Sequence, residues 1–285
     1  GKLGGRELMH GSDLDLVFVY DHSDDVDASD GNKPLAPSVY FMRLAQRIVS
    51  AISAPTGEGK LYEIDLRLRP SGNKGPIAAR LGGYFDYLKD SAWTWEFMAL
   101  TRARPISGPT ELQAQISAGI RDLLTMPRDA NNLIYEVDHM RSRMAGEHQG
   151  ASIWDFKHHR GGLVDIEFIV QNFQLSLGPD DPTVLSPTTM EALRKLSTAN
   201  ALSYNDADVL MSALKLWQGL QSIIRLIGPE RLEEGQPPAG QANALCRVAE
   251  VETFDVLRLL VEEKALAVRD TYARLIQHPA GKLAE

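Results

Sequence analysis

The chain has 285 residues, of which 44% are hydrophobic and 24% charged, and this composition excludes a disordered or fibrous protein. The length favours two domains of roughly 100–200 residues each. A net charge of −8 argues against a protein that coats nucleic acid. The single Cys246 excludes an internal disulfide, no apolar run is long enough for a membrane span, and residues 1–5 show no apolar core of a signal peptide. We therefore expect a cytoplasmic protein with no membrane or nucleic-acid partner.

The first third of the chain combines strand and helix patterns. Residues 13–20 are β-branched and aromatic, and residues 61–69 alternate with period two, so both are predicted strands. Between them, Ser38 is the predicted N-cap of a helix that ends before Pro55 and covers one sheet face with its apolar stripe. Residues 21–37, rich in Asp, Gly and Pro, are a predicted loop.

From about Glu111 the strand signals fade and helical periodicity takes over. The clearest predicted helices are residues 131–144, 163–177, 187–198, 207–227 and 252–276. We predict an α+β fold in which a sheet with helices, residues 1–108, is followed by an all-α helical bundle, residues 109–285.

Asp13 and Asp15 alternate with leucines on the first predicted strand, so both carboxylates project from the same face. Two like charges held close together favour a cation, and hard oxygen ligands at this spacing suit Mg²⁺, or two such ions. A solvated strand end would give the same Asp-x-Asp pattern.

The second predicted strand presents an apolar face and a polar face. Asp65 lies on the polar face with Glu63, Arg67 and Arg69. If this face adjoins the first strand, three carboxylates meet the metal ions while the arginines reach anionic oxygens. The simpler alternative is a solvent-facing strand with internal charge pairs.

Glycines precede the paired acids. Gly4 and Gly5 let the backbone approach a ligand closely, and the Ser12 hydroxyl can help to hold a phosphate. A structural turn would need the same glycines, so this pattern gains weight only from its position before Asp13.

Two further motifs have a structural interpretation. Trp93 and Trp95 are expected to pack at the domain junction, with the neighbouring charged residues around them. Asp165 and Glu167 are two apart on a predicted helix and do not share a face. We therefore expect them, with the histidines before them, to make caps and interdomain hydrogen bonds instead of doing catalysis.

These stretches together resemble one enzyme family. The matching segments are residues 4–8, 11–16, 62–72, 93–96, 99–104 and 161–168. They resemble the polymerase-β-type nucleotidyltransferase signature as it occurs in glutamine synthetase adenylyltransferase, and the resemblance is strong to about residue 175. In sequence, these segments are more similar to the carboxy-terminal half of that bifunctional enzyme, which transfers AMP. The strand that precedes the glycine motif in the family is expected to be missing.

The resemblance implies a mixed sheet of the polymerase-β type and a regulatory role in nitrogen assimilation. The implied reaction moves AMP from ATP to a tyrosine of glutamine synthetase and releases pyrophosphate. Two alternatives stay open: phosphorolytic removal of that AMP to give ADP, and a non-catalytic module that senses nucleotides.

The family pattern also implies roles for individual residues. Asp13 and Asp15 hold two Mg²⁺ ions, and Asp65 binds the ion that activates the hydroxyl and accepts its proton. A second set contacts the phosphates of ATP: Gly4, Gly5, Ser12, Arg67 and Arg69. The PII signal protein and glutamine are the implied regulators.

Overall fold

The computed structural model describes residues 1–57, 59–60, 62–148, 152–228, 232–235 and 237–283. The chain forms two compact units, Gly1–Leu124 and Thr125–Glu285. The first unit combines short strands with helices and the described part of the second is helical, so the fold is α+β. The division lies after the helix that begins at Thr110, because that helix contacts two helices of the first unit. No helix in the described part of the chain is long and apolar enough to cross a membrane.

Four short strands form two parallel pairs in the first unit. In the first pair, β1 (Leu14–Asp15) lies beside β3 (Ile64–Asp65), and Asp15 is the register partner of Asp65. In the second pair, β2 (Phe18–Tyr20) lies beside β4 (Ala78–Arg80). The described strands are thus paired in parallel, whereas we expected a mixed sheet.

Both predicted strands are shorter in the structure. The first is divided into β1 and β2, which pair with different partners. The second is reduced to β3, and Leu61 lies outside the described residues. The cause is a turn: the Arg67 amide donates to the Asp65 carboxylate at 2.8 Å, and the Gly72 amide donates to the Arg69 carbonyl at 2.8 Å. A side chain that bonds a nearby backbone amide in this way competes with strand pairing.

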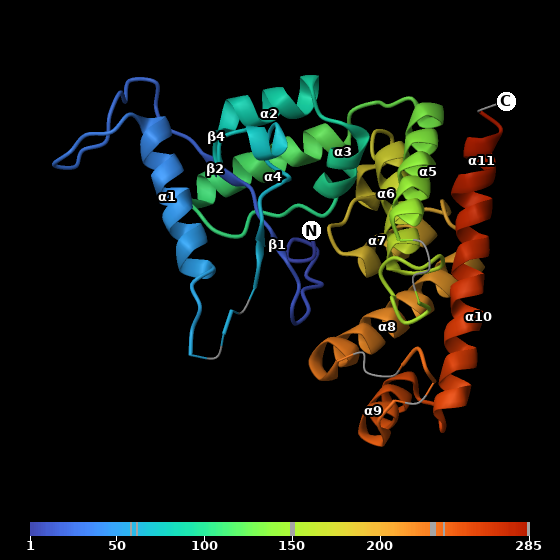
Figure 1. Cartoon of the computed structure of the whole chain (residues 1–285). Helices are drawn as coiled ribbons and strands as arrows, with labels where there is room; N and C mark the ends of the chain where they lie inside the picture. Colours follow the sequence, from blue (N-terminus) through green and yellow to red (C-terminus); the bar gives the residue numbers. More distant parts are fainter. Residues whose placement is uncertain (58, 61, 149–151, 229–231, 236, 284–285) are drawn as a thin grey trace. The chain divides into compact units, whose positions relative to one another are not determined.

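Helices cover the second strand pair (Figure 1). Both α1 (Pro37–Ile52) and α2 (Leu81–Asp90) contact β4. Helix α1 begins one residue before the predicted N-cap Ser38, because Pro37 needs no amide partner in the first turn. Only Ala45 of α1 is fully buried, so the small sheet covers the predicted apolar stripe incompletely.

The rest of the first unit is helical. A 3₁₀ turn (Gly72–Lys74) follows the turn after β3. Helix α3 (Thr94–Leu100) contacts α4 (Thr110–Leu124), which also contacts α2. The predicted loop 21–37 contains no helix or strand up to residue 36, and its last residue, Pro37, begins α1.

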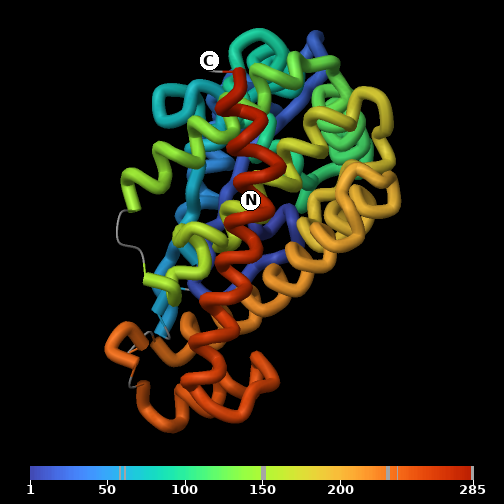
Figure 2. Tube along the Cα trace, turned by 90° about the vertical axis from the view of Figure 1, so that its right-hand side faces the viewer, coloured from blue at the N-terminus to red at the C-terminus, as the bar shows by residue number. Residues whose placement is uncertain are grey.

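All five helices predicted for the second half are present. They are α5 (Ala130–Glu147), α6 (Leu163–Leu177), α7 (Thr189–Thr198), α8 (Tyr204–Ile227) and α10 (Phe254–Tyr272). A 3₁₀ turn (Pro182–Val184) precedes α7, and α9 (Ala239–Ala249) was not predicted. A π-helical segment (Ala273–Gln277) and α11 (His278–Gly281) extend α10 in one continuous rod, red in Figure 2.

Helix α6 is the central element of the second unit. It contacts α5, α7, α8 and α10, and Ile166, Ile169 and Leu175 are completely buried. A helix that is apolar on nearly all sides belongs in a core, which explains why its bounds could be predicted to the residue.

Candidate active site

The parallel pair β1–β3 brings two acidic side chains together. Asp15 and Asp65 are register partners, and neighbouring strands lie about 4.8 Å apart. Side chains at paired positions project from the same face of a sheet, so the two carboxylates are neighbours. Asp65 therefore does not lie remote from the Asp-x-Asp segment or on the opposite face.

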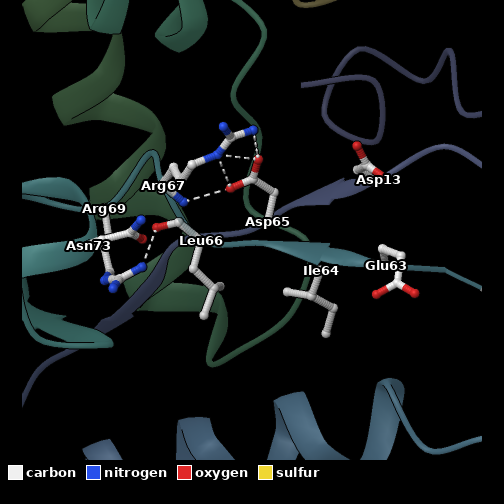
Figure 3. Close-up of a pocket in the computed structure, with 8 residues that line it drawn as sticks. All are labelled: Asp13, Glu63, Ile64, Asp65, Leu66, Arg67, Arg69 and Asn73. Atoms are coloured by element: carbon white, nitrogen blue, oxygen red, sulfur yellow. Dashed lines mark hydrogen bonds and ion pairs between the residues drawn. The ribbon is translucent and has the colours of Figure 1, made fainter.

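A pocket of about 550 Å³ opens at this strand pair (Figure 3). Its lining comes from Asp13 and from the segment that includes β3 and the turn after it: Glu63, Ile64, Asp65, Leu66, Arg67, Arg69 and Asn73. In Figure 3 the Asp65 side chain extends away from Ile64 and Leu66, toward Arg67. The pocket thus combines carboxylates and guanidinium groups from two distant parts of the sequence.

Arg67 is the counter-ion of Asp65. Its Nε donates to Oδ1 at 3.0 Å and to Oδ2 at 2.8 Å, and its Nη2 also donates to Oδ2. The hydrogen bonds from Arg67 keep the pKa of Asp65 below its usual range. In turn, the carboxylate of Asp65, followed by the charges of Asp15 and Asp13, raises the pKa of Arg67. One guanidinium therefore lies within electrostatic range of all three predicted acids.

The donor chemistry of the three acids suits a hard divalent cation, because each supplies carboxylate oxygens and Asp13 is exposed to solvent. In the arrangement seen here both oxygens of Asp65 accept from Arg67. Among the described residues, no three His, Cys, Asp or Glu side chains gather as a ready metal-binding cluster. Metal binding by Asp13, Asp15 and Asp65 stays a prediction.

Arg69 stabilises the turn that forms one wall of the pocket. Its Nη1 donates to the Leu66 carbonyl at 2.7 Å and its Nε to the Gly75 carbonyl at 3.2 Å. A Cβ at Gly75 would lie 1.9 Å from the Pro70 carbonyl oxygen, so this close turn requires glycine. A contact between Arg69 and phosphate stays a prediction.

The three residues predicted to cradle phosphate have partners within the first unit and do not line the pocket. A Cβ at Gly4 would lie 2.1 Å from the Arg102 carbonyl oxygen, so Gly4 allows two chain segments to approach closely. The Gly5 amide donates to the Gly1 carbonyl at 3.1 Å. The Ser12 hydroxyl is buried and accepts from the Met9 amide at 3.2 Å. Their role toward phosphate stays a prediction.

The segment after α3 anchors the amino-terminal residues of the first unit. Arg102 forms a buried ion pair with Glu7, and Arg104 donates to the Leu3 and Gly4 carbonyls at 3.2 Å each. Sequence reasoning missed the Glu7–Arg102 pair, whose partners are 95 positions apart.

Trp93 is 70% exposed and Trp95 is 41% exposed, and packing of their rings at the domain junction stays a prediction. In this segment, residues 93–96, the Glu96 side chain is buried. Its carboxylate accepts from the Trp93 amide at 2.9 Å and from the Tyr87 hydroxyl at 3.0 Å, and so caps α3.

Asp165 in the second unit has a structural role. Asp165 is completely buried, pairs with the Arg141 guanidinium and accepts from the Gly161 amide at the start of α6. Helix α6 has no side-chain hydrogen bond at its N-cap Gly162, and both partners of Asp165 belong to the second unit. Arg141, which sequence reasoning missed, also donates to the carbonyls of His158 and His159 at 3.2 and 3.3 Å.

Comparison with known proteins agrees with this organisation. Residues 1–119 match the family model described as glutamate-ammonia ligase adenylyltransferase, and residues 134–234 match the model described as GlnD PII-uridylyltransferase. The chain is 44% identical over 280 residues to the bifunctional glutamine synthetase adenylyltransferase/adenylyl-removing enzyme of Brucella suis, and 41% identical over 276 residues to that of Rhodopseudomonas palustris.

These alignments cover 98% and 97% of the chain but 28% of each relative, so the chain spans a little over a quarter of the length of these relatives. The match includes both the acidic pocket of the first unit and the helical second unit. Over the segment that it spans, the chain is therefore similar to the bifunctional glutamine synthetase adenylyltransferase/adenylyl-removing enzymes.

Proposed function

We propose that this chain transfers AMP from ATP to a tyrosine hydroxyl of glutamine synthetase. The names of the relatives state glutamine synthetase as the substrate and give both activities, addition and removal of the adenylyl group. The observation that supports the proposal best is the register pair Asp15–Asp65, with Asp13 on the wall of the same pocket as Asp65. An acidic pocket with guanidinium groups at its edge is suited to bind a nucleoside triphosphate together with its cations.

In the proposed reaction the tyrosine oxygen forms a bond to the α-phosphorus of ATP, the bond to the bridging oxygen breaks, and pyrophosphate leaves. Mg²⁺ held by Asp13, Asp15 and Asp65 would offset phosphate charge and favour loss of the hydroxyl proton. Asp65, whose pKa is lowered by its hydrogen bonds from Arg67, is ionised at neutral pH and can accept a hydrogen bond or a proton from the incoming hydroxyl.

The arginines of the pocket supply positive charge where the leaving pyrophosphate carries negative charge. Arg67 is 74% exposed at its side chain and lines the pocket, which leaves it able to reach a phosphate. Arg69 keeps the turn in place through two backbone carbonyls. Cationic groups beside the phosphates stabilise the negative charge that develops in phosphoryl transfer. Control by PII or glutamine stays a prediction from the family resemblance.

Removal of AMP would use the same acids with orthophosphate as the nucleophile. Two sequence features favour the direction of transfer: the motif from Gly11 to Asp15, and Glu63 before Ile64. A two-arm assay separates the directions. One arm supplies α-labelled ATP, Mg²⁺ and unmodified glutamine synthetase; the other supplies adenylylated synthetase and orthophosphate.

We expect label to accumulate on the synthetase in the first arm and no loss of AMP in the second. Asp24→Asn is the matched control, because this exposed carboxylate pairs with Arg80 outside the pocket and its loss should leave the rate unchanged. Loss of AMP only in the second arm would support the removing activity. Nucleotide binding with no change in either arm would favour a sensing module.

A further inference from the structure

The bond between Arg67 and Asp65 occupies the carboxylate that the proposed reaction needs. Both Oδ1 and Oδ2 accept from the guanidinium, and Oδ1 also accepts from the Arg67 amide at 2.8 Å. A carboxylate has about four lone-pair sites, and three donor groups, the Arg67 amide, Nε and Nη2, make four contacts with it here. A divalent cation that binds Asp65 must therefore displace at least part of this contact.

The two partners differ in their freedom to move. The Asp65 side chain is 17% exposed and belongs to a paired strand, whereas the Arg67 side chain is 74% exposed and lies in a turn. Within the described part of the chain, the guanidinium of Arg67 bonds only Asp65. Displacement thus moves the arginine and leaves the acid in place.

We propose that Arg67 is the resident counter-ion of this acidic site and that it transfers from Asp65 to a phosphate group when the nucleotide binds, which frees Asp65 for the cation. This inference rests on the proposed function, and it adds that cation and phosphate bind cooperatively. Without phosphate, a divalent cation competes with the charge of Arg67 for the same oxygens. With phosphate present, Arg67 has an alternative anionic partner, and the competition disappears.

Cooperativity of this kind is reciprocal, and couplings between two ligands are typically about 5- to 150-fold in affinity. The pocket also contains a natural control. Arg69 has the same charge and lines the same pocket, yet it bonds the carbonyls of Leu66 and Gly75 and not the carboxylate of Asp65. An effect of general positive charge would appear in both arginine variants, whereas counter-ion exchange requires Arg67.

The test measures binding of Mn²⁺ to the 285-residue chain by the electron paramagnetic resonance signal of the free ion. Each protein is titrated alone and with α,β-methylene-ATP, which cannot release pyrophosphate. We expect Arg67→Gln to bind Mn²⁺ roughly tenfold more tightly than the wild type in the absence of nucleotide, and the nucleotide to strengthen Mn²⁺ binding less in the variant. Arg69→Gln should not tighten Mn²⁺ binding in the absence of nucleotide, because Arg69 does not bond the Asp65 carboxylate.

Arg67→Lys serves as a second variant, because a lysine keeps the charge but cannot bond both carboxylate oxygens in the same planar way. In the absence of nucleotide, its affinity for Mn²⁺ should lie between those of the wild type and Arg67→Gln. If the wild type binds Mn²⁺ with the analogue and Arg67→Gln shows no gain without it, the exchange is overturned while the proposed function stands. If neither protein binds Mn²⁺ with the analogue, both the exchange and the proposed metal-dependent function are overturned.

Discussion

Asp165→Asn should strongly destabilise the second unit. Asp165 is 0% exposed at its side chain and Arg141 1%, so neither charge has water as an alternative partner. Removing one partner of a buried ion pair costs about 3–5 kcal/mol, because the other charge stays buried without compensation. Asparagine has almost the same volume as aspartate, and therefore the loss reports charge and not a cavity.

A loss of about 3–5 kcal/mol is a large fraction of the stability of a typical domain, which is about 5–15 kcal/mol. Equilibrium unfolding in urea, followed by circular dichroism at the helical signal, gives the midpoint and slope from which the free energy of unfolding is obtained. We expect the midpoint of the variant to fall substantially while the slope stays unchanged. Arg141→Met combined with Asp165→Asn should cost less than the sum of the two single changes, because the double variant leaves no unpaired charge.

Glu191→Gln is the matched control. Glu191 forms an ion pair with Arg194 on the surface of α7, where the side chains are 47% and 61% exposed, and such pairs contribute about 0–1 kcal/mol. If Asp165→Asn changes the free energy of unfolding by less than about 1 kcal/mol, like the surface control, the assignment of Asp165 to a buried structural pair is wrong.

Three further predictions concern burial and close packing. Burial raises the pKa of Tyr84 to about 12, so in an absorbance titration its phenol should ionise at a higher pH than exposed tyrosines do. The free energy of unfolding linked to its neutral form, about 3 kcal/mol, is present below pH 10 and is lost as the pH rises toward 12. Burial lowers the pKa of His159, so the stability due to its neutral form is present above about pH 6.5 and declines as the pH falls below that value; an NMR titration that gives an ordinary pKa would contradict this. Gly4→Ala should lower the midpoint of thermal unfolding, because its Cβ would lie 2.1 Å from the Arg102 carbonyl oxygen, whereas Gly31→Ala, with no atom within 4 Å, should not.

Helices could be predicted well because their signals are local. The apolar pattern of α6 is bounded by glycine on both sides, and the predicted and observed bounds agree at Leu163 and Leu177. Strand lengths could not be predicted in the same way. The turn that ends β3 depends on the Asp65 carboxylate accepting from the Arg67 amide, and period-two alternation contains no sign of that bond.

The acidic pocket was accessible to sequence reasoning because alternation on two strands places acids on one face. The ion pairs that hold the surrounding structure were not, since Glu7 and Arg102 come from distant segments with no shared periodicity. Asn73, which lines the pocket, was also missed; the Ser-Gly turn signal before it was the available indication that residues after Pro70 return to the site.

The most direct test of the account replaces Asp65 by asparagine and measures incorporation of AMP from α-labelled ATP into glutamine synthetase, with nucleotide binding measured on the same preparation. We expect nucleotide binding to persist and the rate of incorporation to fall by about 100-fold or more, because the position that should hold the cation and accept the proton has lost its charge. A rate close to that of the wild type would contradict the assignment of Asp65 to the chemistry.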